Sequence, residues 1–460
     1  MTPASRRRTG ARPAPARSAA VRVLERVERD AAYADLALEA ELARLRLAPR
    51  DAALATELVF GALRWQRYLD WILAPHSRRR LAALDARVRV ILRVTAYQLA
   101  FLERVPPFAA VDDAVSLARG RPGVAEYVNA VLRAFARRGA REREPAPPRD
   151  PLEALATRCS FPTWLAARWV ERWGGAEAET LMRALCERPL LTLRANTLRT
   201  TRDALGARLA AEEGLASRPT PYAPEGLVVT GPGGAPSAWR AFADGAFAVQ
   251  DEASMLVAHL LAPRPGETVA DACAAPGTKT THLAQLMEDR GRVLALDPAP
   301  ARLAHVREAA ARLGLSSIEA LDGTVEALAP RFRAGCDAVL VDAPCSNLGV
   351  LRRNPEVKWR RQPADLAVTA ARQGRILTAA AAMVRPGGRL VYATCSLEPE
   401  ENAGVVRDFL AANPAFHPDP PAEFPLPLDP DGFLRCLPHR HGTDGFTAVR
   451  FHRDPTAHVI

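Results

Sequence analysis

Several common features are missing from this chain of 460 residues. No apolar run reaches the roughly eighteen residues that a membrane-spanning helix needs, and no secretory signal pattern opens the chain. The seven cysteines include no C-x-x-C pair and no zinc-ligand spacing. An odd number of cysteines in a long chain is typical of free thiols in a reducing compartment. We therefore expect a cytoplasmic protein of two or three domains, without a structural metal.

Lysine is almost absent, since only Lys279 and Lys358 interrupt a set of 62 basic residues. A lysine kept in so arginine-rich a chain indicates a position where a compact ammonium suits better than a guanidinium. The net charge of +10 is also unevenly placed, because residues 1–150 hold 28 basic and 17 acidic side chains, against 34 and 35 in the rest. A basic N-terminal third predicts a surface that meets phosphates, although a merely solvated basic domain is the alternative.

The composition of the chain and the spacing of its apolar residues divide it into five parts. Residues 1–16 predict a disordered basic tail, with an organelle-targeting segment as the alternative. Apolar positions at helical spacing predict a helical domain over 17–140, and the proline-rich segment 141–151 predicts a linker. Residues 152–250 predict a small mixed domain of helices and short strands. From 251 to 455, strand-like runs alternate with helical stretches, which predicts a parallel sheet with helices on both faces.

Polar signatures follow the strands of this predicted sheet, and ligands bind at the carboxyl ends of such strands. The loop DACAAPGTKTTHLAQL (271–286) combines small residues with the start of a helix, but it is neither a Walker loop nor a G-x-G-x-x-G turn. Asp297 ends the next strand, where an acid can accept hydrogen bonds from ribose. Asp322 ends the third and could meet an adenine amino group. Each aspartate alone could be a turn or helix cap, but together they predict an adenosine-bearing ligand.

Two further strands each end in a cysteine–serine pair, in DAPCSNLG with Cys345 and in YATCSLEPEEN with Cys395. Both loops should lie at the same edge of the sheet, because the carboxyl ends of parallel strands share one edge. We expect the other five thiols to be small buried side chains without chemistry: Cys159, Cys186, Cys273, Cys336 and Cys436.

The motifs DACAAPGTKT, DAPCSNLG, RRNPEVKW and YATCSLEPEEN together resemble the Sun/RsmB-type RNA 5-methylcytosine methyltransferases. QDEAS (250–254) and RCLPHRHGTDGF (435–446) extend the resemblance, and the segment EYVNAVLRAF is similar to the NusB-like domain of the bacterial branch. The resemblance covers the chain from about residue 17 to residue 452. It implies a multidomain α and α/β protein: an all-helical NusB-like domain, a small mixed α+β domain and a Rossmann-like methyltransferase sheet.

The resemblance also implies S-adenosyl-L-methionine (SAM) as cofactor and assigns roles to residues. Cys395 would be the nucleophile, Cys345 would assist release of the product, and Asp342 would position the base. The implied cofactor contacts are Cys273, Ala274, Ala275, Pro276, Gly277, Thr278, Lys279, Asp297, Asp322 and Asp342. Because a thiolate is the reactive form, we expect Cys395 in an electropositive environment supplied by Lys279, Lys358 or loop N–H groups.

The substrate expected from this resemblance is an unpaired or flipped cytosine, because a base inside a helix cannot bring its ring to a thiol. The NusB-like domain favours 16S ribosomal RNA. Arg194 and Asn196 in LRANT resemble the family's Arg-x-Asn pattern and have either an RNA-binding or a structural role, and Lys358 is a further candidate RNA contact. We expect a monomer that needs neither a metal ion nor a membrane. One alternative is a transfer-RNA or DNA cytosine methyltransferase, although in a DNA enzyme of the Pro-Cys type Cys395 would be idle. The other is a non-catalytic RNA-binding or antitermination protein, which would be expected to have lost the cysteines and aspartates that are present here.

Overall fold

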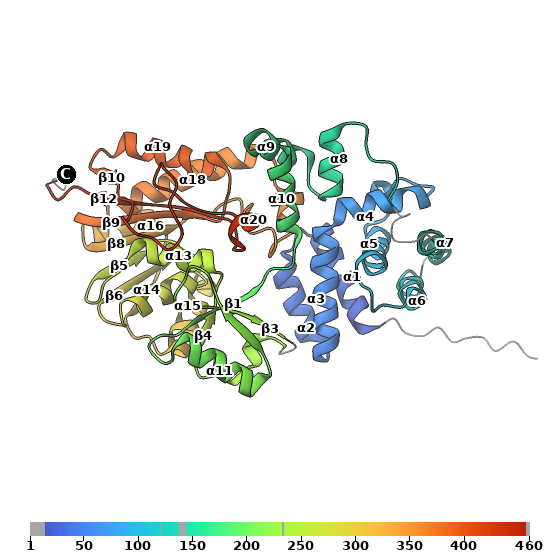
Figure 1. Ribbon diagram of the computed structural model, residues 1–460, viewed down its shortest axis with the longest axis horizontal. Helices are drawn as coiled ribbons and strands as arrows, with labels where there is room; N and C mark the ends of the chain where they lie inside the picture. The colour runs from blue at the N-terminus through green and yellow to red at the C-terminus, as the bar shows by residue number, and fades with distance from the viewer. Residues whose placement is uncertain (1–13, 121, 138–143, 232–233, 457–460) are drawn as a thin grey trace, which may run out of the picture. The chain divides into compact units, whose positions relative to one another are not determined.

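The computed structural model describes residues 14–456 apart from 121, 138–143 and 232–233 (Figure 1). The predicted tail 1–16 therefore lies almost entirely outside the described residues, and its last two residues already belong to the first helix. The chain forms two compact units. The helical unit comprises the chain up to Glu187 together with Leu351–Arg360, and the mixed unit comprises Arg188–Val350 and the chain from Arg361 onward. Within the described residues, no helix is long and apolar enough to cross a membrane.

The helical unit begins with seven helices, as the 3.6-residue spacing of apolar positions predicts. Proline at the first turn starts α1 and α3, and the side chain of Asp85 caps α5 by accepting from the Arg87 N–H. The core of these helices is buried leucine, isoleucine, valine and phenylalanine, including Leu58 and Phe135. The helices are α1 Pro15–Arg29, α2 Ala34–Leu45, α3 Pro49–Arg64, α4 Gln66–Leu73, α5 Ala86–Phe101, α6 Pro107–Leu117 and α7 Val124–Ala136.

The boundary of this unit differs from the predicted linker at 141–151. Three further helices belong to the helical unit, and a single turn, α17, comes from much later in the chain. The side chain of Arg67 on α4 donates to the carbonyl of Phe161 at 2.8 Å and to Thr163 Oγ1 at 2.8 Å, which ties these helices to the earlier ones. Their bounds are α8 Pro151–Arg158, α9 Thr163–Trp173, α10 Gly175–Cys186 and α17 Val357–Arg360.

The mixed unit starts with a small antiparallel sheet of order β2-β3-β1-β4. Its inner residues, including Leu193 and Phe247, pack against α11 and Trp239. The elements are β1 Leu191–Ala195, α11 Arg202–Glu213, β2 Ala216–Pro219, β3 Gly226–Thr230, α12 Arg240–Ala243 and β4 Phe247–Val249.

The larger sheet has the order β10-β12-β9-β8-β5-β6-β7, with β11 paired to β12. Strands β5 to β9 run parallel, and β12 runs antiparallel to β9. The predicted α/β class is thus confirmed. The strands are β5 Thr268–Asp271, β6 Arg292–Asp297, β7 Ile318–Asp322, β8 Cys336–Asp342, β9 Val384–Thr394, β10 Phe416–Pro418, β11 Leu434–Cys436 and β12 Phe446–Arg453.

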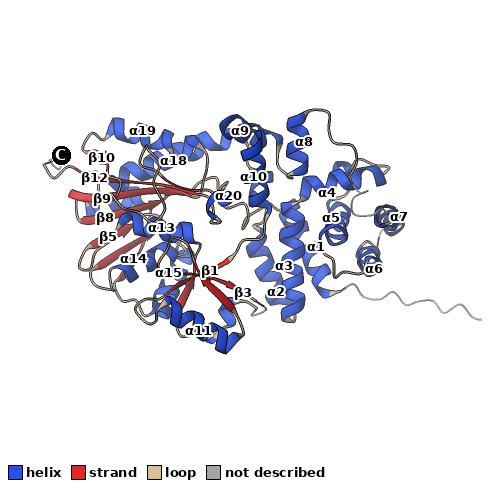
Figure 2. Ribbon diagram, viewed as in Figure 1, coloured by secondary structure: helices blue, strands red, loops and turns tan. Residues whose placement is uncertain are grey.

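Helices cover both faces of this sheet, as Figure 2 shows. Alternate strand residues point to opposite faces, so Leu340 and Val391 join the core under α13 and α14, whereas Val339 and Leu390 join the core under α18 and α19. The helices are α13 Glu252–Leu261, α14 Thr278–Leu286, α15 Pro300–Leu313, α16 Val325–Leu328, α18 Pro363–Ala381, α19 Ala403–Ala412 and α20 Pro438–His441.

Candidate active site

The carboxyl ends of the five parallel strands meet at one edge of the large sheet. Asp271, Asp297, Asp322 and Asp342 are the last residues of β5, β6, β7 and β8, and Cys395 directly follows β9. The register places Asp297 opposite Asp322, so these residues are neighbours despite their separation in sequence. The structure therefore brings the predicted cofactor aspartates and the two cysteine loops to a single edge.

The loop between β5 and α14 depends on one glycine. Gly277 has a φ of +104°, and a Cβ at this position would lie 3.0 Å from the Cα of Val306. Glycine is the residue that adopts this backbone conformation without strain. The helix α14 begins at the next residue, Thr278, so the free N–H groups of its first turn face the end of this loop. A small-residue turn and a helix N-terminus are suited to a polar ligand.

Asp271 holds this loop in place, a role that the sequence analysis did not assign. Its Oδ2 accepts from Thr280 Oγ1 at 2.7 Å, and its Oδ1 accepts from the backbone N–H of Cys273 at 3.4 Å. Burial raises the pKa of Asp271 to about 6. Burial also raises the pKa of the Cys273 thiol, so this cysteine is a poor nucleophile, in line with the prediction that it is present for its size.

The two outer aspartates differ in exposure. Asp297 is buried, and its Oδ1 accepts from the Ala299 N–H at 2.9 Å, so one oxygen has the turn-capping role weighed above. Its Oδ2 lies 3.5 Å from the guanidinium of Arg302. Asp322 is exposed. Both carboxylates thus retain an oxygen that can accept a hydrogen bond from a ligand.

The two cysteines that end their loops are in contact. The Sγ atoms of Cys345 and Cys395 lie 3.1 Å apart. The amide oxygen of Asn347 is 3.0 Å from the Cys395 sulfur and 3.4 Å from the Cys345 sulfur. The Gly349 N–H donates to the carbonyl of Cys395 at 2.9 Å, which joins the two loops. The predicted convergence of the two thiols is present, and Asn347 is an additional residue at the site.

The serines that follow the cysteines have a shared structural partner, Glu401. This buried carboxylate accepts from the N–H of Ser346 at 2.7 Å, from its hydroxyl at 2.5 Å and from the hydroxyl of Ser396. The hydroxyl of Tyr392 on β9 donates to the Glu401 carbonyl at 2.6 Å. One carboxylate therefore fixes both loops, which explains why a serine follows each cysteine.

The electrostatics around Cys395 differ from the expectation of an electropositive site. The hydrogen bond with Cys345 and burial raise the pKa of the Cys395 thiol well above its ordinary value. The carboxylate of Asp342 acts in the same direction and Lys279 opposes it. Lys279 Nζ donates to Asp342 Oδ2 at 2.7 Å and lies 4.8 Å from the centre of the Phe446 ring. The protein's own groups thus keep Cys395 as the neutral thiol.

Lys358 does not fit the predicted roles in RNA contact or thiol activation. Its side chain is 1 % exposed, and its ammonium donates to the carbonyl of Arg64 at 2.8 Å. It also lies 4.1 Å from the ring centre of Phe161 and 3.5 Å from the sulfur of Cys186. All these partners belong to the helical unit. Lys358 therefore holds the 351–360 segment within that unit.

Arg194 and Asn196 do not fit direct RNA contact either. Both side chains are buried, at 0 % and 1 % exposure, and both are hydrogen-bonded inside the mixed unit. Asn196 Nδ2 donates to the carbonyls of Gly245 and Leu313, each at 2.9 Å. These bonds link the end of β1 to the end of α15. The side chains of the Arg-x-Asn pattern therefore form hydrogen bonds inside the mixed unit.

A sheet of this kind, with a glycine-dependent loop after its first strand and acids after the next two, is typical of enzymes that bind a nucleoside-containing cofactor, among them the SAM-dependent methyltransferases. Comparison with known proteins agrees. The family described as 16S rRNA methyltransferase RsmB/F matches residues 258–452, the NusB family matches 14–137, and the ferredoxin-like domain of the RsmF/B-like methyltransferases matches 161–235.

Curated relatives match along most of the chain. The "probable ribosomal RNA small subunit methyltransferase B" of Bacillus subtilis is 38 % identical over 438 residues, which is 94 % of this chain and 97 % of that protein. The ribosomal RNA small subunit methyltransferase B of Pseudomonas putida is 37 % identical over 413 residues, covering 86 % of this chain and 89 % of its own length. The chain belongs to the RsmB/F family of rRNA methyltransferases, which confirms the resemblance.

Solved structures agree with this assignment. The protein solved as PH0851 aligns with a TM-score of 0.81 and 28 % identity, covering 97 % of this chain and all of that one. NSun6 from Pyrococcus horikoshii, solved with SFG, aligns with a TM-score of 0.58 and 26 % identity, over 65 % of this chain and 99 % of its own. The predicted fold class and the methyl donor SAM are thereby confirmed.

Proposed function

We propose that this enzyme methylates carbon 5 of a cytosine in 16S rRNA, with Cys395 as the nucleophile and Cys345 assisting release. The observation that carries this proposal is the contact between the two sulfur atoms, 3.1 Å apart, at the edge of the sheet where the cofactor loop ends. Five other cysteines are present in the chain, but these two are the ones that follow parallel strands as a cysteine–serine pair.

The chemistry of cytosine requires a nucleophile from the protein. Carbon 5 is too weak a nucleophile to take a methyl group directly. Addition of the Cys395 thiolate at carbon 6 breaks the ring's 5,6 double bond and makes carbon 5 electron-rich. Cys395 sits directly after β9 and is partly exposed, so its sulfur can reach a base placed at the edge of the sheet.

A second thiol is needed because the methylated ring remains bonded to Cys395. The proton on carbon 5 must leave before the carbon–sulfur bond at carbon 6 can break. Cys345 lies 3.1 Å from Cys395, so its thiolate form is close enough to take that proton, itself or through a water molecule, and so become the neutral thiol. The amide oxygen of Asn347, near both sulfurs, can accept a hydrogen bond from either thiol and hold them in this arrangement.

Asp342 is suited to orienting the base. Its carboxylate is fixed by the ammonium of Lys279 at 2.7 Å, and its side chain is 27 % exposed. A fixed, partly exposed carboxylate can accept a hydrogen bond from the cytosine amino group, and in its protonated form it can donate a hydrogen bond to nitrogen 3, which is an acceptor. Removal of electron density toward nitrogen 3 makes carbon 6 more susceptible to attack by the thiolate.

The residues of the loop fit SAM, which supplies the methyl group on a positively charged sulfonium. Gly277 has no side chain at a point where a Cβ would clash, and the N-terminus of α14 follows it. Asp297 and Asp322 end neighbouring strands in register, where they can receive the ribose hydroxyls and the adenine amino group. The predicted contacts 273–279, with Asp342 beside them, complete this proposed site.

We infer 16S rRNA as the substrate because the similar curated proteins carry the name ribosomal RNA small subunit methyltransferase B. The target must be unpaired or flipped out, since carbon 6 is inaccessible within a stacked helix. The experiment is bisulfite sequencing of ribosomal and transfer RNA from a strain lacking this gene. We expect loss of one or more 5-methylcytosines in 16S rRNA. Persistence of every such site, with loss of a site in transfer RNA, would favour the transfer-RNA alternative.

The raised pKa of Cys395 predicts a pH dependence. A thiol whose pKa is raised is neutral at neutral pH, so the reactive fraction grows as pH increases toward that pKa. We expect kcat/KM for RNA to rise by up to about tenfold per pH unit between about pH 6.5 and about pH 9. A plateau already reached below neutral pH would show that the thiolate is preformed.

A further inference from the structure

One face of α14 is polar although the helix is buried. Thr278, Thr281, His282 and Gln285 recur at the spacing i, i+3, i+4 and i+7, which places them along a single side of the helix. Thr281, His282 and Gln285 are all less than 5 % exposed. A buried polar stripe of this kind is stable only if its groups find partners. Those partners come from the small antiparallel sheet.

Arg194 on β1 supplies the first set of partners. Its Nη1 donates to the carbonyl of Thr278 at 2.7 Å and to the side chain of Gln250, and its Nη2 donates to Thr281 Oγ1 at 3.0 Å. Thr278 is the first residue of α14 and directly follows the glycine of the cofactor loop. The fully buried guanidinium of Arg194 is therefore hydrogen-bonded to the first turn of α14, directly after the cofactor loop.

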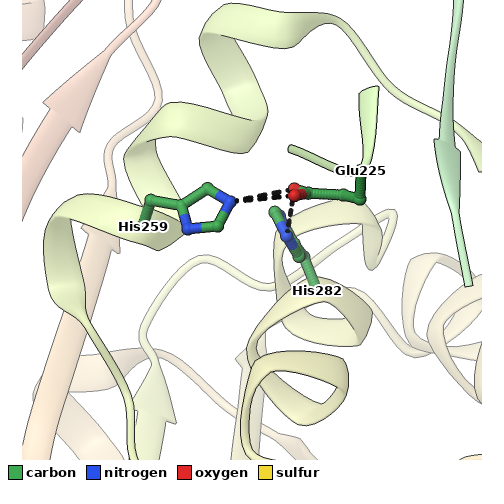
Figure 3. A group of neighbouring side chains, drawn as sticks. All are labelled: Glu225, His259 and His282. Atoms are coloured by element: carbon green, nitrogen blue, oxygen red, sulfur yellow. Dashed lines mark hydrogen bonds and ion pairs between the residues drawn. The ribbon is translucent and has the colours of Figure 1, made fainter. Parts of the chain in front are cut away.

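Glu225, directly before β3, supplies the second set. Figure 3 shows its carboxylate between two imidazoles, with His259 Nε2 at 3.0 and 3.1 Å from the two oxygens and His282 Nε2 at 2.8 Å from Oε1. Burial alone would raise the pKa of Glu225, but the hydrogen bond with His259 and the close approach of His282 outweigh it and lower the pKa. Burial lowers the pKa of His282 to about 3, so this imidazole is neutral. The charge of Glu225 also attracts the buried guanidinium of Arg194, which opposes the lowering of the Arg194 pKa by burial.

The opposite side of the same helical turn reaches the reaction site. Lys279 pairs with Asp342 at 2.7 Å, and Thr280 donates to Asp271 at 2.7 Å. The first turn of α14 is thus held from two directions. A shift of this turn would move the cofactor loop and the carboxylate that orients the base together.

We infer that Arg194 and Glu225 are positioning residues for SAM binding: the small sheet holds the first turn of α14 and thereby keeps the cofactor loop in its binding conformation. The inference rests on the proposed placement of the cofactor at 273–279. It gives the Arg-x-Asn segment a function inside the protein in place of RNA contact. A residue that only stabilises the fold would leave the SAM affinity of the folded enzyme unchanged. A change in that affinity therefore distinguishes a positioning residue from a purely structural one.

Two imidazoles and a carboxylate are also ligand types for Zn²⁺, and among the described residues these three form a group of suitable ligand atoms within 4.8 Å. Glu225 already interacts with the buried positive charge of Arg194. A divalent cation here would add two further positive charges to a buried region within the electrostatic range of this guanidinium, at high cost. We therefore interpret the cluster as a clamp in which Glu225 is hydrogen-bonded to His259 and lies against His282.

The test is isothermal titration of the full-length protein with SAM in the absence of RNA. Arg194→Met removes the charged hydrogen bonds, and we expect the Kd for SAM to rise about tenfold or more, with kcat at saturating SAM reduced less than about threefold. Arg194→Lys keeps the charge but cannot bridge the same partners, and we expect an intermediate Kd. Thr281→Val removes one partner while leaving Arg194 in place, and we expect a rise of about threefold. This milder variant keeps the inference testable if Arg194→Met does not fold.

Arg312→Met is the matched control. Its guanidinium links α15, on which it lies, to the small sheet region by bonds of 2.9 Å to the carbonyls of Phe242 and Phe247, whereas the bonds of Arg194 go to the first turn of α14. We expect its Kd for SAM to stay within about twofold of the unaltered enzyme. An unchanged Kd in both Arg194→Met and Thr281→Val would overturn the inference, as would one stoichiometric metal ion in the purified protein that is lost in His259→Ala.

Asp297→Ala separates this inference from the proposed cofactor site itself. If Asp297→Ala leaves SAM affinity intact, the placement of the cofactor is wrong. If Asp297→Ala weakens binding but the Arg194 and Thr281 variants do not, the cofactor site stands and the positioning role fails.

Discussion

Replacing Cys395 with alanine should reduce RNA methylation by a factor on the order of 10⁴ or more, the scale of loss seen when a nucleophile is removed from a covalent mechanism. The remaining groups could still bind SAM and hold the base, but carbon 5 of cytosine would stay a weak nucleophile. The measurement is transfer of a radiolabelled methyl group from SAM to 16S rRNA under single-turnover conditions. The Kd for SAM should be unchanged, which distinguishes lost chemistry from lost binding.

Cys159→Ala is a matched control, because it also removes a buried thiol but lies in the helical unit, where burial raises the pKa of the thiol to about 11. We expect this variant to methylate RNA at close to the normal rate. Full activity in Cys395→Ala would refute the assignment of the nucleophile. Equal loss in both variants would point to a general effect of removing cysteine.

The parts of the site that the sequence made predictable are those with a distinctive local pattern. The glycine loop and the two cysteine–serine pairs each follow an apolar strand, and parallel strands bring such ends to one edge of a sheet. That reasoning placed Gly277, Cys345 and Cys395 together, as the structure does. Asn347 and Glu401 could not be singled out, because an asparagine or glutamate in a polar loop has no local feature that marks it as a partner of a sulfur or of two serines.

The errors have a common physical origin. Arg194 is a candidate RNA contact through the family's Arg-x-Asn pattern, for which a structural role is equally open, and Lys358 is one of only two lysines in an arginine-rich chain. In the structure both are fully buried and their charges are offset by carbonyl oxygens and rings. The sequence does not distinguish a buried arginine or lysine from an exposed one, so only the neighbours of the side chain in the structure reveal its role. The linker at 141–151 stays a prediction: it lies between the two family matches, 14–137 and 161–235, but a proline-rich segment does not show which helices pack together across it.

The raised pKa of Cys395 has a mechanistic use. A preformed thiolate 3.1 Å from another sulfur and close to a carboxylate would be repelled by any negative charge on either group. A neutral thiol avoids that repulsion and is less prone to side reactions. A positively charged methyl donor near Cys395 would lower the pKa of the thiol by Coulomb attraction. Ionisation would then be favoured when the donor is bound, which couples activation of the nucleophile to the presence of the methyl group.

Replacing Cys345 with alanine should arrest the reaction after methyl transfer. Cys395 could still add to carbon 6 and carbon 5 could still take the methyl group, but the thiol that removes the carbon 5 proton would be missing. The product would stay bonded to the enzyme through the Cys395 sulfur. We expect a covalent RNA–protein complex that survives a denaturing gel, with turnover reduced by a factor on the order of 10² to 10⁴, the usual contribution of a positioned acid or base.

The design of this experiment distinguishes arrest from simple inactivation. With labelled SAM, the shifted band of Cys345→Ala should carry the methyl label, and it should be absent when SAM is omitted, because addition to carbon 6 is reversible until the methyl group is transferred. The double variant Cys345→Ala with Cys395→Ala should give no band. If Cys345→Ala turns over normally and accumulates no complex, another group removes the proton, and Asn347→Ala would then test whether a water held by that amide does so. A band that persists in the double variant would show that the bond is made by a residue other than Cys395.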